Sequence, residues 1–189
     1  MFKRYITVLF ILFLVSCNYT GKNKTTPKKE TFPINNKNLE QLEGMFERCS
    51  FKVPKGLYKK TEENIFISKR LNSRIEFISN RYDVGDEEFI SSKEGFIDKY
   101  KKDIKVISVK SDEETFEILG RDSKNYIFIK GYFTIGYGHD AITGEGDVNT
   151  PFYSMSGILK IQYPIESKTD FDNILPIISK TYTCNFGEF

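Results

Sequence analysis

Three apolar segments separated by short polar turns constrain the fold of this chain more than any other feature. The segments are 104–109, 115–120 and 125–135, and polar residues and glycine fill the turns at 111–114 and 120–125. Runs of β-branched and aromatic residues bounded by such turns predict strands that form an antiparallel meander. The third segment is apolar on both alternating faces, so we expect a central strand that is covered on both sides.

Further strands are predicted on either side of this meander. Short apolar or alternating runs indicate them at 51–53, 64–71, 74–79 and 154–164. Asn72 and Ser73 join the middle two strands, and Ile75 and Phe77 would then face one side of the sheet.

Helical spacing of apolar residues predicts three helices, at 39–46, 86–102 and 167–182. The middle helix has acidic residues first and lysines last, which suits the helix macrodipole. Thr169 is the expected N-cap of the closing helix. Pro176 lies inside that helix, where a proline costs about 3 kcal/mol, so we expect a kink or a break there.

The order of these elements predicts an α+β fold, with an antiparallel β-sheet flanked by helices. The pattern Phe-x-Val-Pro-x-Gly at 51–56, the strand at 158–164 and the helix after it resemble proteins of the Mog1/PsbP-like fold. Over residues 48–183 this resemblance implies an α/β/α sandwich with a non-enzymatic binding or assembly role. Those proteins often carry a tryptophan after the opening turn, where this chain offers Leu57 or Tyr58.

Residues 1–17 resemble the signal of a bacterial lipoprotein. A basic start precedes an apolar core at 5–15, which is shorter than the roughly 20 residues that span a bilayer. The lipobox-like sequence Leu-Val-Ser-Cys implies that residues 1–16 are a signal peptide and that Cys17 is lipidated. Acyl chains such as palmitate contribute about 0.8 kcal/mol per buried methylene and would hold the chain on a membrane. The alternative is a short membrane anchor with an incidental cysteine.

The rest of the chain divides into a tether and one domain. Residues 17–37 are rich in Asn, Lys and Thr and too poor in apolar residues to offset their ordering entropy, which predicts a flexible tether. Residues 38–189 suit a single domain. Asn18 follows the lipidated cysteine in place of the aspartate associated with inner-membrane retention, so the expected location is the outer membrane, with the domain outside the cytoplasm.

The net charge of the chain does not favour nucleic acid as a partner. The formal charge of +2 falls to zero once Lys3 and Arg4 are removed with the signal peptide. The basic field typical of nucleic-acid binding is therefore missing.

Cys49 and Cys184 are the cysteines that remain once Cys17 is lipidated. Two cysteines outside the cytoplasm often pair, and a bridge across so long a loop would contribute about 4–5 kcal/mol in the chain-entropy model. The alternative is two buried thiols that lie too far apart to bond. Two cysteines and one histidine do not suit a zinc site.

The segment 136–153 is the candidate binding loop. Its polar residues are Tyr137, His139, Asp140, Glu145 and Asp147, set among four glycines. Alternating oxygen ligands can suit calcium, but the spacing is not that of an EF-hand, so no metal or other cofactor is assigned. A solvated loop, a partner-binding loop and a metal site stay open as interpretations.

Sequence patterns typical of catalysis are missing. The chain has no G-x-S-x-G elbow, no P-loop and no dinucleotide fingerprint, so we expect no enzyme. The prediction is a membrane-anchored lipoprotein of the cell envelope that acts as a non-catalytic protein-binding or assembly module, with a partner of unknown identity. The alternatives are a small-ligand or metal-binding periplasmic lipoprotein and, third, a hydrolase.

Overall fold

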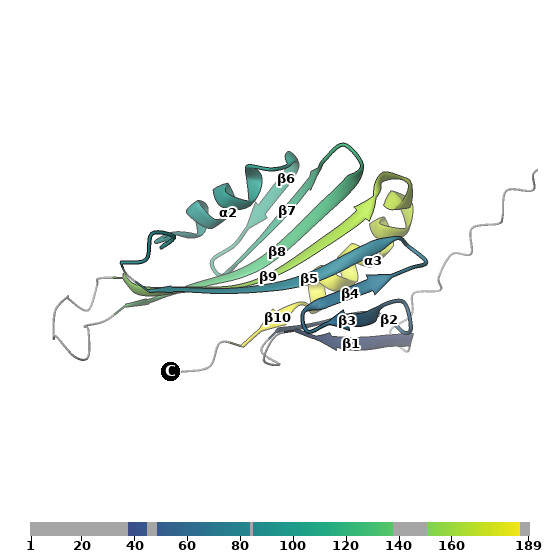
Figure 1. Cartoon of the computed structure of the whole chain (residues 1–189), viewed down its shortest axis with the longest axis horizontal. Helices are drawn as coiled ribbons and strands as arrows, with labels where there is room; N and C mark the ends of the chain where they lie inside the picture. Colours follow the sequence, from purple (N-terminus) through teal and green to yellow (C-terminus); the bar gives the residue numbers. More distant parts are fainter. Residues whose placement is uncertain (1–37, 45–48, 84, 138–150, 186–189) are drawn as a thin grey trace, which may run out of the picture. The chain divides into compact units, whose positions relative to one another are not determined.

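A seven-stranded antiparallel sheet dominates the computed structural model, which describes residues 38–44, 49–83, 85–137 and 151–185 (Figure 1). The strand order is β3-β4-β5-β9-β8-β7-β6. The strands are β3 (Lys59–Glu62), β4 (Ile65–Ser68), β5 (Ser73–Asp83), β6 (Lys105–Ser111), β7 (Thr115–Arg121), β8 (Asn125–Tyr137) and β9 (Pro151–Pro164). Together with two helices they confirm the predicted α+β class and the antiparallel meander.

The long strand β8 lies between β7 and β9, so both of its edges are paired. Ile127, Phe128 and Ile129 are all buried although they alternate between the two faces of the sheet. This confirms the prediction of an inner strand that is covered on both sides, since side chains at successive positions point to opposite faces.

A second sheet replaces the predicted leading helix. Residues Leu39–Glu43 form strand β1, which pairs with β2 (Cys49–Pro54), and β2 pairs in turn with β10 (Thr183–Cys184). The helix predicted at 39–46 is therefore wrong. Pairing with β2 places Leu42 opposite Phe51, and this tertiary contact prevails over the weak helical spacing.

Helix α2 spans Lys93–Lys101 and is shorter than the helix predicted at 86–102. Its N-cap is Ser92, whose side chain accepts a hydrogen bond from the Gly95 amide at 3.1 Å. The residues before it are held in turns, because the Asp86 carboxylate accepts from the Asp83 amide at 2.9 Å. A good N-cap preceded by a turn thus fixes the start of the helix at Ser92.

Helix α3 spans Lys168–Thr181 and follows a short 3₁₀ turn, η3 (Ile165–Ser167). Its N-cap is Ser167 and not the predicted Thr169. A kink or a break is predicted at Pro176, and because the helix continues through this residue the break is wrong. The proline ring is exposed, and the carbonyl that loses its helical donor belongs to Asp172, an exposed residue that water can reach.

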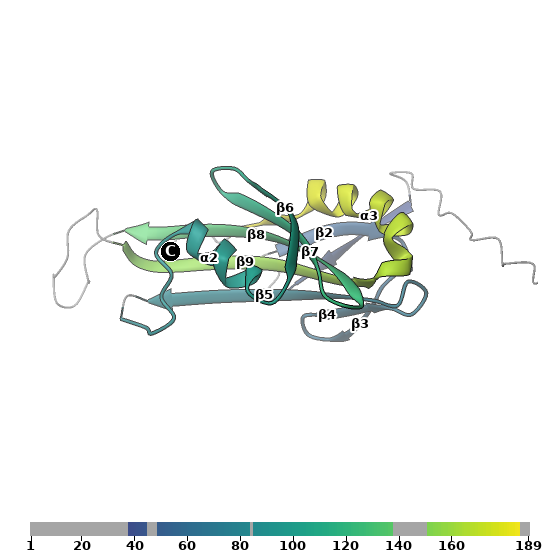
Figure 2. The same ribbon diagram turned by 90° about the horizontal axis from the view of Figure 1, so that it is seen from above.

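The two helices contact opposite faces of the seven-stranded sheet. Phe96 and Ile97 of α2 pack in one cluster with Phe116 and Ile118 of β7. Glu117, between those two β7 residues, is instead hydrogen-bonded to α3. Figures 1 and 2 show α2 lying over the sheet on the side away from β1, β2 and β10.

The three-stranded sheet packs on the same face as α3. Phe51 of β2 lies 5.3 Å from Phe77 of β5, ring centre to ring centre. Gly44, just after β1, approaches so closely that a Cβ atom there would lie 2.4 Å from the Phe77 ring. The described elements all belong to the unit formed by residues 33–189.

Cys49 and Cys184 form a disulfide across a sequence separation of 135 residues. They are also direct partners in the β2–β10 ladder. The bridge therefore ties the last described strand to the second strand of the chain.

Candidate functional site

A groove of about 520 Å³ opens between α3 and strands β6, β7 and β8. Five of its lining residues come from one side of the helix and five from the sheet. They are Asp172, Leu175, Pro176, Ser179 and Lys180 of α3, and Ser108, Lys110, Glu117, Leu119 and Phe128 of the strands. We refer to this feature as the α3 groove.

The helical period explains why α3 presents a second face to the groove. Phe171, Ile174 and Ile178 are buried and hold α3 on the core. Positions one residue on from these, such as Leu175 and Ser179, are rotated away from the core contact and line the groove.

Strand register places the sheet side of the groove. In the β6–β7 ladder Ser108 pairs with Leu119, and Lys110 pairs with Glu117. Paired residues point to the same face, so these four side chains form a strip that faces α3. Phe128 of β8 extends the strip because it pairs with Leu119.

A polar cluster of Lys130, Glu117 and Ser179 lies at one end of the groove, which Glu117 and Ser179 line, and Lys130 lines the smaller hollow that adjoins it. The Lys130 ammonium is 3.0 Å from Glu117 Oε1 and 3.3 Å from Ser179 Oγ. The Ser179 hydroxyl also donates to Glu117 Oε1. The side chains of Lys130 and Glu117 are only 12 % and 20 % exposed, so the ion pair is largely shielded from water.

These contacts keep Glu117 ionised. Burial alone would raise the pKa of its carboxyl, but hydrogen bonds from Ser179 and Lys130 outweigh that effect and lower the pKa. A carboxylate held in this way is a poor proton acceptor near neutral pH, because its charge is already satisfied. The cluster is therefore suited to fixing the groove and contacting a ligand.

A smaller hollow of about 290 Å³ continues from the groove toward the β6–β7 turn, and its lining shares Lys110, Glu117 and Ser179 with the groove. The turn is held by Asp112, whose carboxylate accepts from the Thr115 amide at 2.6 Å and from the Thr115 hydroxyl at 2.8 Å. Hydrogen bonds from the Thr115 side chain and from the backbone amides of Thr115 and Glu114 lower the pKa of the Asp112 carboxyl. The end of the groove is thus bounded by a well-bonded turn.

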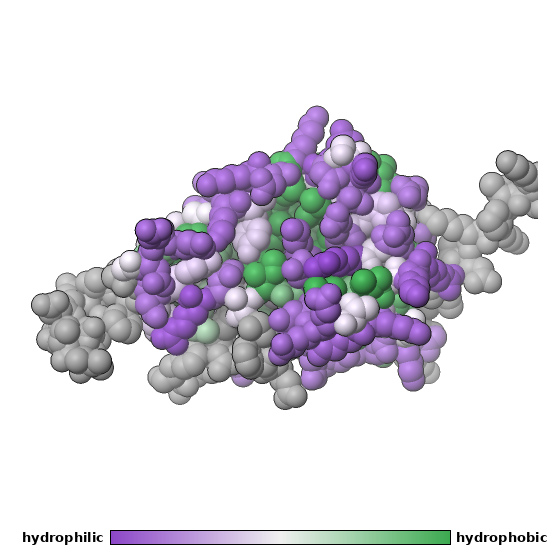
Figure 3. All heavy atoms as spheres, in the orientation of Figure 1, coloured by the Kyte–Doolittle hydropathy of each residue, from purple (hydrophilic) through white to green (hydrophobic). Residues whose placement is uncertain are grey.

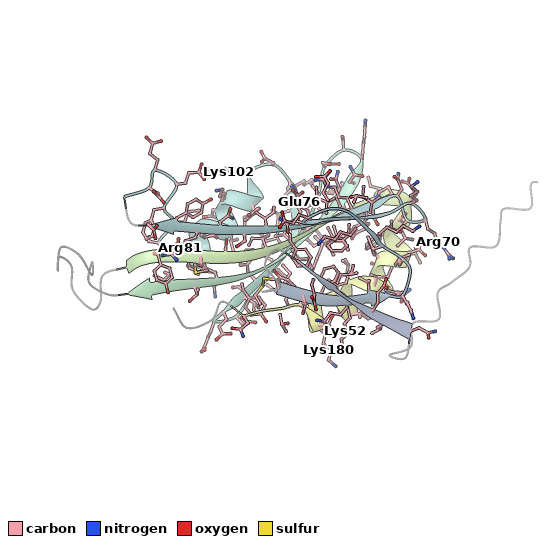
Figure 4. The ribbon with its side chains drawn as sticks, turned by 60° about the horizontal axis from the view of Figure 1, so that its bottom comes forward. Lys52, Arg70, Glu76, Arg81, Lys102 and Lys180 are labelled. Atoms are coloured by element: carbon pink, nitrogen blue, oxygen red, sulfur yellow. A yellow bond between two sulfur atoms is a disulfide. The ribbon has the colours of Figure 1, made fainter. Side chains whose placement is uncertain are left out.

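The charge left over at the groove is positive. Lys130 neutralises Glu117, and Lys168 pairs with Asp172 at 2.8 Å. Within the part of the chain that the structure describes, Lys110 and Lys180 make no ion pair. Figure 4 shows Lys180 on the side of the molecule that also carries Lys52.

Most of the residues that the sequence singled out lie outside the described residues. These are Cys17, His139, Asp140, Glu145 and Asp147. Tyr137 is the last residue of β8, where it pairs with Pro151 of β9 after a register shift. The structure thus positions the two strands that flank the candidate loop.

The groove residues were missed in the sequence, although one signal was present. Glu117 and Lys130 are single charges inside otherwise apolar strands, and they have opposite signs on consecutive strands. Such charges are expected to pair when the hairpin register brings them together, and they are register partners in the structure. Ser179 and Pro176 carry no such signal, because their role depends on where α3 docks.

Two further observations describe the chemistry of the described residues. No three His, Cys, Asp or Glu side chains among them gather closely enough to hold a metal ion. Neither described helix has the length and apolar character needed to cross a membrane.

The chain matches none of the protein-family models and none of the curated proteins with which it was compared.

Proposed function

We propose that this chain is a lipoprotein, anchored in the cell envelope through Cys17, that acts as a non-catalytic protein-binding or assembly module. The signal-like residues 1–17 support the anchor. The Cys49–Cys184 disulfide is consistent with an oxidising compartment such as the periplasm or the outer-membrane surface. The membrane is then the first partner, through the lipid, and a protein is the second.

The finer fold assignment is also a proposal. We infer an α/β/α sandwich of the Mog1/PsbP-like kind, to which the sheet β1-β2-β10 is added. It is supported by α2 and α3 contacting opposite faces of the large sheet. The opening strand β2 and the closing strand β9 followed by α3 agree with the sequence pattern of that fold.

The observation that carries the functional proposal is the α3 groove, in which Lys130 neutralises Glu117 and Lys168 neutralises Asp172. Leu119, Phe128 and Leu175 give it an apolar floor, whereas Lys110 and Lys180 stand at its rim. An apolar centre with a polar rim is the usual arrangement of a protein-binding surface. Glu117 is tied to Lys130 and Ser179, which favours contact over proton transfer.

Site-specific photocrosslinking in the native host tests this proposal. A photoreactive residue replaces Leu175 in the groove of the tagged full chain, and Lys59 on the distant edge strand β3 is the matched control position. We expect one defined protein adduct from position 175 and none from position 59. Equal adduct patterns at both positions would contradict a groove-specific partner.

The anchor has its own test. Cys17→Ala removes the lipidation site, so the chain should leave the membrane fraction or keep its signal segment, and labelling with radioactive palmitate should stop. Continued palmitate labelling of the variant would contradict lipidation at Cys17.

The volume of the groove favours a small ligand as a second candidate. Its 520 Å³ lies within the range of about 300–1,000 Å³ that is common for small-molecule sites. A ligand that binds only the folded state raises the melting temperature according to its concentration relative to Kd. A thermal shift that Leu175→Trp abolishes, without a protein adduct at position 175, would favour this candidate.

A further inference from the structure

The two edges of the seven-stranded sheet are built differently. β3 has four residues, all exposed, of which three are charged. β6 has seven residues, all exposed, and Val106, Ile107 and Val109 are 38 %, 50 % and 39 % accessible. Proteins usually protect sheet edges with short strands and charges, which describes β3 but not the middle of β6.

Hydrophobic residues also reach the surface in Figure 3, among mostly hydrophilic side chains. Aliphatic side chains exposed along a free edge are the arrangement that pairs with another strand. β6 is therefore the edge of this sheet that is suited to accept a partner.

The hydrogen bonds at the turn between β6 and β7 determine which backbone amides of β6 point away from β7. The Asp112 amide donates to the Thr115 carbonyl at 3.0 Å, so these two residues are a hydrogen-bonded pair. Because such pairs alternate along an antiparallel ladder, Lys110 also bonds to β7, and Val109 and Ser111 direct their amides away from it. The segment from Ser108 to Ser111 keeps regular register, since the irregularity lies before it, between Val106 and Ser108. It is thus a short regular template for one more strand.

The two faces at this edge differ in chemistry. Lys110 and Ser108 face the α3 groove, whereas Val109 pairs with Ile118 and faces the opposite side. A strand added to β6 alternates its side chains between the same two faces. One set would lie beside Lys110, and the other would lie beside Val109.

The charges beside β6 indicate which side chains an added strand should carry. Lys105 and Lys110 are the charged residues of β6, and Lys180 lines the groove that Lys110 faces. Among the described residues none of these three lysines makes an ion pair. A second copy of this chain would bring two positively charged β6 strands side by side, which is unfavourable because like charges on facing strands repel.

We propose that β6 binds an extended segment of a partner protein as an eighth strand, and that this segment alternates acidic and aliphatic residues. The acids lie toward Lys110 and Lys180, and the aliphatic residues cover Val109. This inference rests on the proposed protein-binding function and assigns its mode of recognition and the chemistry of the partner.

A peptide probe tests the recognition directly. The full chain, purified in detergent, is titrated with a blocked, fluorescently labelled peptide of about ten alternating Glu and Val residues. One control peptide replaces Glu by Lys, and another has the same composition in two blocks. We expect the alternating acidic peptide to bind about tenfold more tightly than either control, because several weak ion pairs and the ladder act together.

Two variants with a matched control locate the contact on β6. Val109→Pro removes an outward amide but no bond to β7, and should weaken binding about tenfold. Val109→Thr keeps the amide and the branched shape, and should stay within about twofold of wild type. Lys110→Glu should reverse the preference between the acidic and basic peptides. Circular dichroism melts confirm that each variant is folded.

Several results would overturn the inference. These are no binding of the alternating acidic peptide at millimolar concentration, equal binding by Val109→Pro and Val109→Thr, and an unchanged charge preference in Lys110→Glu. A dimer that sedimentation detects in wild type and not in Val109→Pro would show that a second copy occupies the edge.

The crosslinking experiment separates this inference from the proposed function. A protein adduct at position 175 that persists unchanged in Val109→Pro would leave a binding module standing and would exclude strand addition at β6. Loss of the adduct in Val109→Pro, with retention in Val109→Thr, is the expected result.

Discussion

At the scale of single residues, the Lys130–Glu117 pair links the sheet to α3. Its two side chains are 12 % and 20 % exposed, and Ser179 of α3 bonds to both of them. Removing one partner from a shielded pair leaves the other charge without compensation, which costs more than the pair itself contributes.

Lys130→Met should therefore lower the free energy of unfolding by about 1–3 kcal/mol, because Glu117 keeps only the Ser179 hydroxyl as a hydrogen-bond partner, besides the more distant charge of Lys110. The control is Lys168→Met, which breaks the exposed pair with Asp172 and should cost less than about 0.5 kcal/mol. Urea unfolding of both variants measures the difference. Similar small losses in the two variants would contradict the structural role assigned to Lys130.

The lowered pKa of Glu117 predicts a specific pH dependence. A carboxyl whose pKa is lower in the folded than in the unfolded state stabilises the protein above its unfolded pKa of about 4.3. That contribution is lost as pH falls from there through the folded pKa. The stability advantage of wild type over Glu117→Gln should be constant from pH 7 to about 5 and shrink below it. Urea unfolding between pH 7 and pH 3 checks this, and parallel curves would refute it.

Gly131 of β8 allows close packing in the core. A Cβ atom there would lie 2.5 Å from Phe116 and 2.6 Å from Ile158, and both side chains are fully buried. Gly131→Ala should cost about 1–3 kcal/mol by overpacking. Ile158→Val removes one of the obstructing methyl groups, so the double variant should lose less stability than the sum of the single variants. Strict additivity in thermal unfolding would argue against this contact.

At the scale of elements, α3 carries an unusual interior proline. Pro176 deprives the Asp172 carbonyl of its helical donor, and both residues line the α3 groove. The proline therefore lowers the stability of the helix at the surface that faces the proposed ligand.

Pro176→Ala should stabilise the protein by about 1–3 kcal/mol, because the restored helical bond outweighs the greater freedom of the unfolded chain. Lys180→Ala, at an exposed position of the same helix, should change stability by less than about 0.5 kcal/mol. Thermal unfolding compares the two variants. An unchanged or lower melting temperature in Pro176→Ala would show that the helix had already adapted to the proline.

The elements that the sequence predicts correctly are those whose hydrophobic periodicity can be read within one short segment. β7 and β8 alternate or run apolar between polar turns, and Ile75 and Phe77 share a buried face. β1 was mistaken for a helix because two leucines three residues apart fit either structure until β2 supplies a partner. The sequence predicts a start of α2 that is too early, because the apolar residues before Ser92 have helical spacing although they lie in turns.

The candidate site was harder to predict than the fold because it is assembled from distant segments. Lys110, Glu117 and Lys130 meet through strand register, and Ser179 joins them only when α3 docks on the sheet. Local periodicity contains no information on that docking. The glycine-rich loop has an unusual composition that is visible in the sequence. The groove consists of common residue types, and only their arrangement in the fold distinguishes it.

At the scale of the whole molecule, both chain ends of the described domain meet on β2. β1 pairs along one edge of β2 and β10 along the other. β10 has only two residues, too few to hold by ladder bonds alone, and the Cys49–Cys184 bridge fastens it. Tyr182, just before β10, packs on Phe77 and Tyr132, so the end of the chain is also part of the core.

The bridge should therefore stabilise the whole fold. It closes a loop of 135 residues, and a loop of that length corresponds to about 2–5 kcal/mol through the restricted unfolded chain. The variant Cys49→Ala/Cys184→Ala should lose that amount in urea unfolding. Dithiothreitol should lower the stability of wild type equally and leave the double variant unchanged. Hydrogen exchange should quicken first at Thr183 and Cys184, whose pairing is shortest, and an unaltered wild-type midpoint in reductant would show that β10 is held by packing alone.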